Sequence, residues 1–560
     1  MLCCQIVLRY VLALKKVLSN VKYDVDYLVV GSGFGGSVSA YRLTQKGYSV
    51  AVMEMGKRWS AETYPRSNWH FHRWLWRPML GLKGFFNIKW FKHVLILHGN
   101  AVGGGSITYA NTLLVPKTEI WEQGSWAGLK DWVAEMPAHY ATAQKMLGVT
   151  ENRILGPADH LLKEAADDWG CGDTFYKTQV GVFFGKEGDT PGSSYPDPYF
   201  DGEGPDRNSC IACGGCMVGC RYNAKNSLDK NYLYLAEKQG AEVFSETRVI
   251  DVVPLNNKAD GEDGYEVTTV SSTSLLFRNK RRWRVKSLVF AGSSLGTQDL
   301  LFKLRDKKSL PNISQQLGRR VRTNAESLIG VRLPNEDNMD AGIAIGSGIY
   351  LDDKTHIEAT RYPRGSDAMG LLVTAMIRGR TDWRRIITWI YTMLRLLVRN
   401  PKKALGALIP FGLAKQTVIL LCMQTLDGHI DMLYKRRWYW PFNKRMVSFG
   451  PKIPAHIPEA SEFALKAARR LGGMAGTLIT EVLFNIPATA HCMGGAGMGR
   501  SADDGVVDVQ SRVFGYKNML VCDGSTLSSN LGVNPSLTIT ALSEHAMSFV
   551  PEKHSAPTDG

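Results

Sequence analysis

The chain has 560 residues, of which 44% are hydrophobic and 21% charged. This composition is typical of a folded protein and excludes a disordered, fibrous or disulfide-stapled chain, and the length exceeds one hydrophobic core, so we expect two domains or two lobes. Lys and Arg outnumber Asp and Glu by 67 to 52, an excess that fits nucleic acid, an anionic membrane or an acidic substrate without choosing among them.

The N-terminal residues 1–22 carry an apolar stripe that Arg9, Lys15 and Lys16 interrupt. They lack a small-residue cleavage site, so we interpret them as an amphipathic extension, either a surface helix or a frayed leader, and not as a secretory signal. The chain has no uninterrupted apolar run of about 18 residues, which argues against a membrane-spanning helix. We therefore expect a cytoplasmic protein whose cysteines are reduced.

Residues 27–54 follow the pattern of strand, glycine turn, helix and second strand. Residues 27–30 are a short apolar run, residues 37–47 have helical spacing, and residues 48–54 are a second apolar run that ends in an acid. The turn has the G-x-G-x-x-G spacing and consists of Gly31, Gly33, Phe34, Gly35 and Gly36 around Ser32. The complete unit predicts a dinucleotide-binding site.

The residue types in this unit each suit a dinucleotide. Gly31 permits the tight turn, Gly33 lets backbone amides approach a pyrophosphate, and Gly36 lets the helix pack on the strand. Glu54 follows Gly31 by 23 residues, the distance at which an acid binds ribose hydroxyls. NAD and FAD both use this turn, so the choice between them depends on other segments.

A second glycine-rich loop occupies residues 98–106 and contains Gly103, Gly104 and Ser106. It is too irregular for a helix or a strand, and such a loop brings its backbone against an extended ligand. A long ligand of this kind favours FAD.

Four of the ten cysteines, Cys210, Cys213, Cys216 and Cys220, have the spacing C-x2-C-x2-C-x3-C. One loop with this spacing can hold an iron–sulfur cluster. No Pro follows Cys220 and no second run of this kind exists. An iron–sulfur cluster, a structural zinc ion, and free thiols or a disulfide all stay open.

Two further segments complete the predicted nucleotide sheet. Residues 241–251 are interpreted as one strand, and residues 287–301 as a strand, a small-residue turn with Ala291 and Gly292, and a helix. Both would join the sheet begun by residues 27–54.

Aromatic and basic side chains alternate in three segments, residues 69–91, 383–413 and 435–440. The second is interpreted as a long helix with recurring arginines, too charged to cross a bilayer but suited to lie in its interface. We expect these segments to contact an anionic membrane surface, against the alternative of a shielded core helix. The sequence has no nucleic-acid-binding motif, so no nucleic acid partner is expected.

Near the C-terminus, residues 515–525 predict a turn, a strand and a turn that contains Asp523 and Gly524. Residues 532–540 then open a helix with Asn534 and Pro535 at its start. The N-terminus of a helix stabilises the electron-rich edge of a reduced flavin ring, which again favours FAD.

The chain resembles the glucose-methanol-choline (GMC) oxidoreductases, FAD enzymes that oxidise alcohols, and most of all their sterol-oxidising branch. The resemblance spans residues 23–550 and is carried by residues 491–499, which match the His-Pro-Leu-Gly-Gly pattern, and by residues 505–508 leading through 523–525 to 532–535. Cys492 stands where the family often has Pro.

The resemblance implies roles for particular residues. His491 would be the catalytic histidine, Asn534 its partner at the flavin edge, and Glu358 a base that isomerises the first product. Imidazole suits the first role because it titrates near neutral pH. Val249 would lie near the adenine, and Asn111 would contact the cofactor, although Tyr109 and Asn111 differ from their usual counterparts.

The implied fold is α/β, with a discontinuous Rossmann-type FAD-binding domain and an inserted α+β substrate domain. The predicted boundaries are an extension at 1–22, the first FAD-binding part at 23–302 with the cysteine loop at 210–220, and the substrate domain at 303–487. That domain includes the interfacial helix at 383–413. The second FAD-binding part follows at 488–550 and a tail at 551–560.

The implied function is FAD-dependent oxidation of a bulky hydrophobic alcohol, a sterol or related lipid, at a membrane surface, with O2 as electron acceptor. One alternative passes the electrons through an iron–sulfur cluster to a quinone or a cytochrome. Another is a non-catalytic lipid-binding protein that keeps the flavin fold. We expect a cytoplasmic, peripherally membrane-associated protein.

Overall fold

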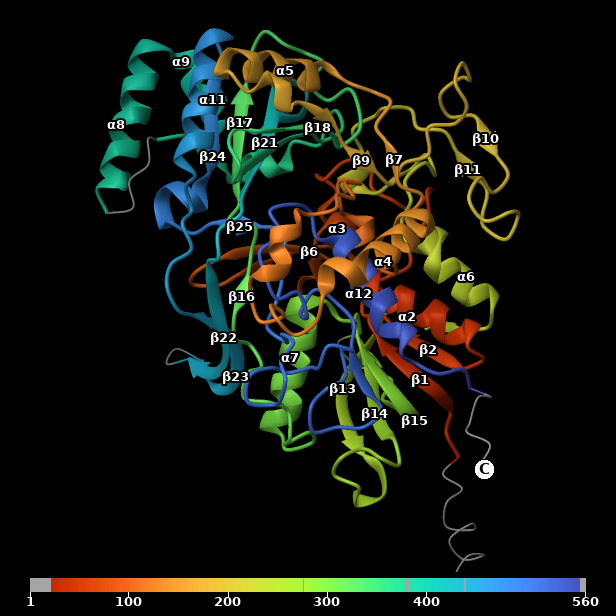
Figure 1. The fold of residues 1–560 in the computed structure, drawn as a ribbon. Coiled ribbons are helices and arrows are strands. Elements are labelled where there is room, and N and C mark those ends of the chain that lie inside the picture. The colour runs from red at the N-terminus through yellow and green to blue at the C-terminus, as the bar shows by residue number, and fades with distance from the viewer. Residues whose placement is uncertain (1–21, 275, 378–382, 438–439, 554–560) are drawn as a thin grey trace, which may run out of the picture.

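The computed structural model describes residues 22–274, 276–377, 383–437 and 440–553. The predicted N-terminal extension therefore lies almost wholly outside the described residues, as does most of the predicted tail. The described chain forms two bodies, each built around a seven-stranded sheet, one above the other in Figure 1.

The first sheet contains the predicted nucleotide-binding unit. β1 (Val25–Val30), α2 (Phe34–Gln45) and β2 (Val50–Met53) follow one another as expected, and β1 pairs in parallel with β2 and with β15 (Arg281–Phe290). The strand order is β12-β2-β1-β15-β14-β13, with β12 (Glu242–Phe244), β13 (Thr247–Pro254) and β14 (Tyr265–Ser271). The helix α7 (Ser293–Asp306) follows β15, as predicted.

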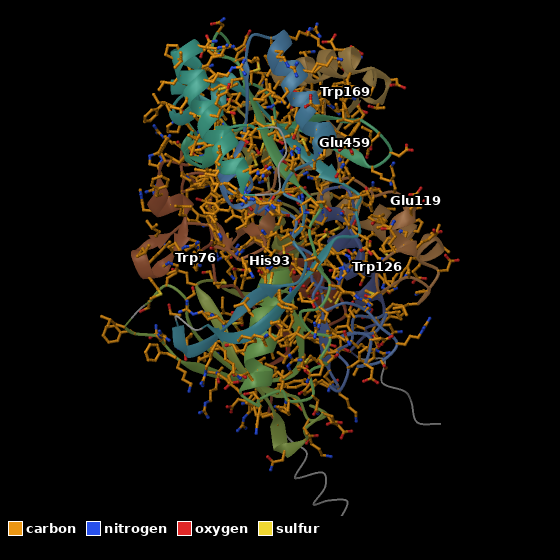
Figure 2. The ribbon with its side chains drawn as sticks, turned by 90° about the vertical axis from the view of Figure 1, so that its left-hand side faces the viewer. Trp76, His93, Glu119, Trp126, Trp169 and Glu459 are labelled. Atoms are coloured by element: carbon orange, nitrogen blue, oxygen red, sulfur yellow. The ribbon has the colours of Figure 1, made fainter. Side chains whose placement is uncertain are left out.

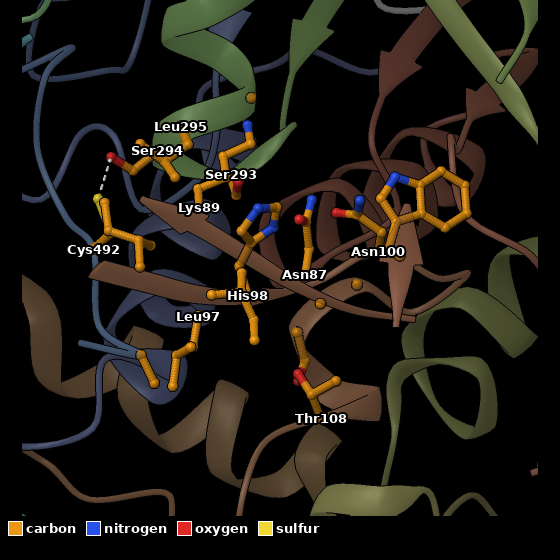
Figure 3. Close-up of a pocket in the computed structure, with 18 of the residues that line it drawn as sticks. Asn87, Lys89, Leu97, His98, Asn100, Thr108, Ser293, Ser294, Leu295 and Cys492 are labelled. Carbon is orange, nitrogen blue, oxygen red and sulfur yellow. Dashed lines mark hydrogen bonds between the residues drawn. The ribbon is translucent and has the colours of Figure 1, made fainter. Parts of the chain in front are cut away.

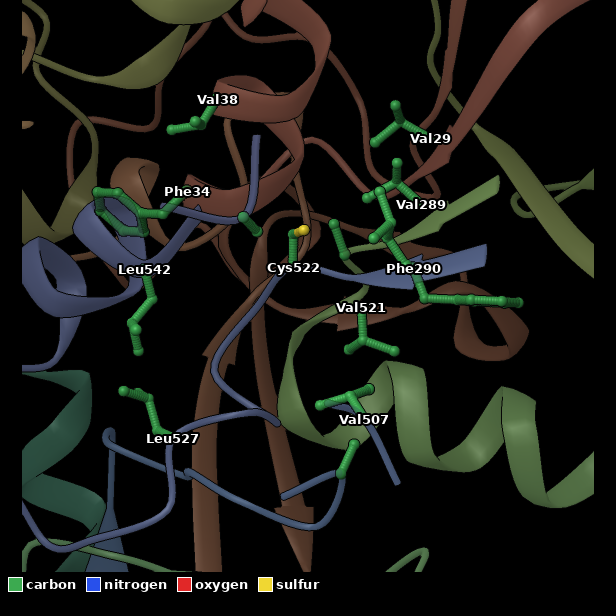
Figure 4. Packing of buried hydrophobic residues seen from close by; sticks show 14 of the residues in the cluster. Val29, Phe34, Val38, Val289, Phe290, Val507, Val521, Cys522, Leu527 and Leu542 are labelled. Carbon is green, nitrogen blue, oxygen red and sulfur yellow. The ribbon is translucent and has the colours of Figure 1, made fainter. Parts of the chain in front are cut away.

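The C-terminal segment completes this sheet. β26 (Met519–Val521) pairs in parallel with β15, and α12 (Ser536–Ser548) packs against α2 and α4 (Trp132–Leu147). Val29, Val289 and Val521 of three neighbouring strands belong to one buried cluster around Cys522 (Figure 4). Arg42 of α2 pairs with Glu544 of α12 at 2.7 Å. The nucleotide-binding body is thus discontinuous in sequence.

The second sheet is antiparallel, with the order β20-β24-β17-β21-β19-β18-β8. Its strands are β8 (Tyr176–Lys177), β17 (Ser327–Arg332), β18 (Ile345–Tyr350), β19 (Thr355–Thr360), β20 (Val373–Ala375), β21 (Thr417–Gln424) and β24 (Met474–Leu478). The helices α5 (Pro157–Trp169) and α11 (Pro458–Arg470) cover one face, where Trp169, seen in Figure 2, meets Phe463 edge-on at 5.7 Å.

The alternation of side chains along β21 assigns the two faces of this sheet. Val418, Leu420 and Cys422 belong to the core under the two helices. Ile419 and Leu421 point the other way and line a large cavity. A strand directs successive side chains to opposite faces, so the same strand supplies both a core and a cavity wall.

The remaining elements are short or lie at the periphery. The helices are α3 (Phe71–Trp74), α6 (Tyr232–Lys238), α8 (Arg384–Arg399), α9 (Pro401–Leu408) and α10 (Leu413–Gln416). The strands are β3 (Trp76–Arg77), β4 (Leu82–Lys83), β5 (Phe86–Trp90), β6 (Leu95–Gly99), β7 (Thr150–Glu151), β9 (Gln179–Val180), β10 (Ser194–Tyr195), β11 (Arg207–Asn208), β16 (Val321–Arg322), β22 (His429–Arg437), β23 (Trp440–Phe449) and β25 (Ala488–Thr489).

Two sequence-based expectations about single elements are wrong. The strand expected at 241–251 is split into β12 and β13, because Glu246 has a left-handed φ of 51° between them. The long helix expected at 383–413 is two helices, α8 and α9, which separate at Asn400 before Pro401. The residue before a proline is disfavoured in the helical region, and this ends α8.

Candidate active site

A cavity of about 1790 Å³ lies between the two sheets. Pockets for a single small ligand typically measure about 300–1,000 Å³, so this cavity has room for a large cofactor and a second molecule. Its walls come from the glycine turn after β1, the loop after β6, the start of α7, the cavity face of the second sheet and the segment before α12.

The start of α2 is suited to hold a pyrophosphate. The helix begins at Phe34 after Gly33, no side chain caps it, and no acidic residue lies in its first turn, so its amides are free for an anion. Gly104 of the second glycine loop lies so close that a Cβ on it would come within 2.5 Å of the Gly33 Cα. Glycine is therefore required where the two loops meet.

Glu54 stands at the end of β2 on the wall of the cavity and is buried. Its carboxylate accepts hydrogen bonds from the Ser32 backbone nitrogen at 3.1 Å, the Ser32 hydroxyl at 2.7 Å and the Gly56 nitrogen at 2.7 Å. Burial raises the pKa of Glu54. The group lies beside the glycine turn, as the predicted ribose contact requires.

Most of the predicted cofactor-binding residues line this cavity. They are Gly31, Gly33, Phe34, Gly35, Glu54, Gly104, Val249, Ala291, Gly292, Asp523, Gly524, Asn534 and Pro535. Figure 3 shows another part of the wall, where Lys89 and His98 of the β5–β6 hairpin face Ser293 to Leu295 at the start of α7. A dashed line there joins the Ser294 hydroxyl to the Cys492 sulfur, at 3.5 Å.

Four of the predicted cofactor contacts do not line the cavity, namely Gly36, Gly103, Ser106 and Asn111. The first three lie within the glycine turn and the second glycine loop, which form the wall. A Cβ on Gly36 would meet the Gly31 oxygen at 2.0 Å, which is the close helix-to-strand contact expected of this glycine. The Gly103 nitrogen donates to the Ser32 hydroxyl at 3.1 Å, and the Ser106 hydroxyl donates to the Gly103 oxygen at 2.7 Å. Asn111 is fully buried with a left-handed φ of 74°.

His491 lies on the cavity wall just after β25, which pairs in parallel with β6 beside the second glycine loop. Its Nδ1 is 2.8 Å from Oε1 of Glu326, a residue that is 1% exposed. The carboxylate also accepts from the Thr489 hydroxyl at 2.6 Å and the Ala490 nitrogen at 3.1 Å. This network assigns the proton to Nδ1 and leaves Nε2 of His491 as an acceptor.

Asn534 and Glu358 meet on the other side of the histidine. The Asn534 Nδ2 is 3.5 Å from the His491 Nε2 and donates to Oε2 of Glu358 at 3.2 Å. Glu358 lies on β19 and is fully buried, behind Asn534 and not on the cavity wall. Among the described residues, Oδ1 of Asn534 and Oε1 of Glu358 have no hydrogen-bond partner. Only Asn534 lines the cavity, so its Oδ1 is the one of the two atoms that a ligand there can reach.

The charges of these residues depend on one another. Burial disfavours the charged form of His491, but the charge and hydrogen bond of Glu326 and the charge of Glu358 outweigh burial and raise the pKa of His491. Burial also opposes the charge of Glu326, yet His491 lowers the pKa of that carboxyl. Burial raises the pKa of Glu358 to about 7. The site therefore holds an imidazole with a raised pKa beside a carboxyl with a pKa of about 7, and perturbed groups of this kind mark a functional site.

Glu326 is the residue that the sequence analysis missed. It immediately precedes β17 as a single acid before an apolar run and belongs to no motif. Its neighbour Asn324 was missed in the same way; the Asn324 Nδ2 lies 3.2 Å from the His491 Nδ1 and donates to the Val533 oxygen at 2.8 Å. Only the fold brings these two residues to His491, 165 and 167 positions further along the chain.

The half of the cavity under the second sheet is apolar. Its wall there is made of Leu328, Ile345, Met369, Val373, Ile419, Leu421 and Leu478. These side chains continue from the face of β17 and β21 to Glu326 and His491. A large apolar ligand can therefore lie along the sheet with one polar end at the histidine.

The four clustered cysteines surround a separate small cavity, together with the buried Lys225. Burial raises the pKa of Cys210 and of Cys216, and the four are free thiols. Within the described residues, no group of three or more His, Cys, Asp or Glu side chains is arranged to hold a metal ion. This geometry counts against the predicted iron–sulfur or zinc ligation.

The fold and the site together define an α/β oxidoreductase with a dinucleotide cofactor. Residues 204–317 and 457–543 match the GMC oxidoreductase family, and residues 29–83 match the NAD(P)-binding Rossmann-like domain. The chain is 59% identical to a cholesterol oxidase of Acinetobacter baumannii, over 95% of both chains. It is 44% identical to a cholesterol oxidase of Mycobacterium tuberculosis, over 95% of this chain and 92% of that one.

The chain belongs to the GMC oxidoreductases. Among solved structures it is similar in fold to a pyridoxine 4-oxidase of Mesorbium loti, with a TM-score of 0.59 and 14% identity over 94% of this chain and 99% of that one. The protein is therefore an FAD-dependent oxidoreductase that acts on CH–OH groups. The family matches confirm the predicted fold class and the predicted cofactor.

Proposed function

We propose that the protein oxidises the hydroxyl group of a sterol, or of a similarly bulky hydrophobic alcohol, to the carbonyl. The observation that carries this proposal is the apolar half of the cavity, which ends at His491 and Asn534. The two cholesterol oxidases at 59% and 44% identity support the same substrate class. A rigid apolar alcohol would exclude water from the site and place one hydroxyl at its polar end.

The residues of the site divide the chemistry among them. The glycine turn, Glu54 and the start of α12 would hold FAD, which when bound would supply the acceptor for the hydride of the carbinol carbon. Nε2 of His491 takes the hydroxyl proton, and the carboxylate of Glu326, 2.8 Å from Nδ1, stabilises the imidazolium that forms. The amide of Asn534 donates to the substrate oxygen and keeps the hydroxyl close to the imidazole.

Oxygen is the electron acceptor that we propose. The two similar proteins from Acinetobacter baumannii and Mycobacterium tuberculosis are both named as oxidases. The predicted alternative passes electrons through an iron–sulfur cluster to a quinone or a cytochrome, and the described cysteines do not form a group arranged to hold a metal. Each turnover would then consume one O2 and release one hydrogen peroxide.

We also propose that Glu358 isomerises an unsaturated product. Isomerisation moves a proton between two carbons, which requires a group that both takes and returns it near neutral pH. Burial raises the pKa of Glu358 to about 7, and its Oε1 has no hydrogen-bond partner among the described residues. To take the proton on that atom, the carboxyl would have to reach the cavity past Asn534. Glu358→Gln should leave oxidation in place while the unisomerised ketone accumulates, which product chromatography would show.

Substrate would be collected from an anionic membrane through α8. The helix has no buried residue. The exposed apolar side chains of the helix are Ile386, Ile387, Ile390, Tyr391, Leu394, Leu397 and Val398, and Trp383 just before the helix is exposed as well. Four arginines recur on the same helix, which suits attraction to anionic headgroups. None of the described helices is both long and apolar enough to cross a bilayer.

The other aromatic segments contribute less to such a surface than the sequence suggests. Trp74, Trp76, Phe85 and Phe91 are buried in the core, whereas Trp90 is 52% exposed. In the third segment, residues 438–439 lie outside the described residues. The proposed membrane surface therefore rests mainly on α8.

Absorption spectroscopy tests the function directly. The purified protein should show bound flavin, and anaerobic mixing with cholesterol should bleach it. Admission of air should restore the colour with formation of hydrogen peroxide. A protein without flavin, or a flavin that no alcohol bleaches, would favour the lipid-binding alternative, and slow reoxidation without peroxide would favour another acceptor.

Vesicle sedimentation tests the membrane surface. Binding should increase with the fraction of anionic lipid and should fall in a Leu394→Asp variant. Val133→Asp, at an exposed position of α4, is the matched control and should bind like the unchanged protein. Equal binding of both variants would refute the role of α8.

A further inference from the structure

Behind Asn534, the strand β19 carries a second buried polar residue that the proposed mechanism does not use. His356 is 2% exposed and lies two positions before Glu358. Residues two apart on a strand point to the same face, so both side chains face the segment that leads into α12. This strand contacts that segment at two points.

The first point is Glu358, which accepts from the Asn534 amide at 3.2 Å. The second is His356, whose Nδ1 lies 3.3 Å from the oxygen of Gly532. Gly532 has a left-handed φ of 68°, and its nitrogen donates to Oδ1 of Asn530 at 3.0 Å. The turn that precedes Asn534 is thus fixed by β19 on one side and by its own asparagine on the other.

The ring of His356 is itself held in one orientation. The Tyr176 hydroxyl lies 2.6 Å from Nε2, and the ring stacks on Tyr350 at 4.6 Å with an interplanar angle of 17°. A Cβ on Gly348, which pairs with Glu358 across β18 and β19, would lie 2.6 Å from the Tyr176 hydroxyl. The sheet leaves this space for the tyrosine.

The hydrogen bonds define the tautomer of His356. The hydroxyl of Tyr176 donates to Nε2, so the ring proton is on Nδ1, which donates to the oxygen of Gly532. Burial lowers the pKa of His356 to about 4, so the ring stays neutral, and this arrangement persists over the physiological range of pH.

We propose that His356 is a positioning residue for the active site: through Gly532 it sets the orientation in which the Asn534 amide faces the reacting hydroxyl. This inference deepens the proposed function and rests on it. The Asn534 Nδ2 lies beside the reacting atoms, 3.5 Å from the His491 Nε2. A displacement of about 1 Å at a reacting centre costs up to about 100-fold in rate, so the position of this amide has to be fixed by its neighbours.

Three variants separate positioning from general packing. His356→Phe keeps a planar ring and removes both hydrogen bonds. His356→Asn restores a donor near the place of Nδ1 and should rescue the defect. Tyr350→Phe keeps the stacked ring, removes a hydroxyl that takes no part in the contact with Gly532, and serves as the matched control.

Anaerobic stopped-flow with cholesterol gives the first measurement. In His356→Phe we expect flavin reduction at saturating alcohol to slow about 10- to 100-fold, with little change in the alcohol concentration that gives half saturation. His356→Asn should recover to within about 3-fold and Tyr350→Phe should stay within about 2-fold of the unchanged protein. Equal slowing of His356→Phe and His356→Asn, or no slowing in either, would overturn the inference.

Crystal structures of the holoproteins give a second measurement, independent of turnover. In His356→Phe the Gly532 turn should shift and the separation of the Asn534 amide from His491 should change, while His356→Asn should keep both. An unmoved Asn534 would overturn the proposal. Should His356→Phe not fold with flavin, Tyr176→Phe removes only the hydroxyl that fixes the tautomer and takes its place in both experiments. If no alcohol reduces the unchanged protein, the proposed function fails, and the crystal structures still decide the role of His356.

Discussion

Replacement of Glu326 by glutamine tests how the site makes an imidazole into a base. The change removes a charge 2.8 Å from His491 and keeps the shape of the side chain. A hydrogen bond to a charged group contributes about 1.5–3 kcal/mol. If that stabilisation is gained only when His491 takes the proton, its loss slows flavin reduction by about 10- to 150-fold. Anaerobic stopped-flow at saturating alcohol measures this directly.

The pH dependence of the same reaction shows in which direction Glu326 shifts the pKa of His491. His491 must be neutral to accept a proton, so the rate of reduction rises with pH through its pKa, which the charges of Glu326 and Glu358 hold above the usual value. In Glu326→Gln, only Glu358 still opposes the effect of burial on His491, so the pKa of His491 falls. The acidic limb of the pH profile therefore moves to lower pH. Glu544→Gln, which removes a charge paired with the half-buried Arg42, is the control. An unshifted limb together with an unchanged rate in Glu326→Gln would refute the reasoning.

Three further changes have definite expected outcomes. His491→Ala should leave flavin bound and lower its reduction by alcohol by about 100-fold or more; a nearly unchanged rate in stopped-flow would contradict its role as base. Gly104→Ala places a Cβ 2.5 Å from the Gly33 Cα at a left-handed φ of 54°, so the purified protein should have lost most of its flavin absorbance, and full occupancy would contradict the contact between the loops. Asp159→Asn breaks a fully buried ion pair with Arg361 at 2.7 Å, which should lower the free energy of unfolding in urea by about 3–5 kcal/mol; a loss below 1 kcal/mol would show that the pair contributes little.

The sequence predicts those parts of the molecule whose signal is local. β1, the glycine turn and α2 follow one another over some 20 residues, so periodicity and glycine spacing locate them. His491 and Asn534 come with recognisable neighbours. Strand 241–251 fails as a prediction because its break depends on one left-handed residue, Glu246, and a glutamate gives no warning of that conformation.

The rest of the site depends on contacts between distant segments. Glu326 reaches His491 only because β17 and β25 meet at the edge of the cavity, and nothing in its own surroundings distinguishes it from a surface acid. Glu358 was predicted by resemblance alone, and its complete burial, the cause of its raised pKa, follows from the pairing of β19 within the second sheet. The spacing of the four cysteines suggests a cluster, whereas their placement in the described structure does not.

The position of β26 and α12 also has a consequence for synthesis on the ribosome. The glycine turn leaves the exit tunnel early, but the strand that pairs with β15 and the helix that covers α2 are encoded more than 470 residues later. A domain generally folds as a unit when its sequence has emerged. The nascent polypeptide therefore has to be kept from aggregating until β26 and α12 have emerged, and the yellow colour of bound flavin should appear only after that point.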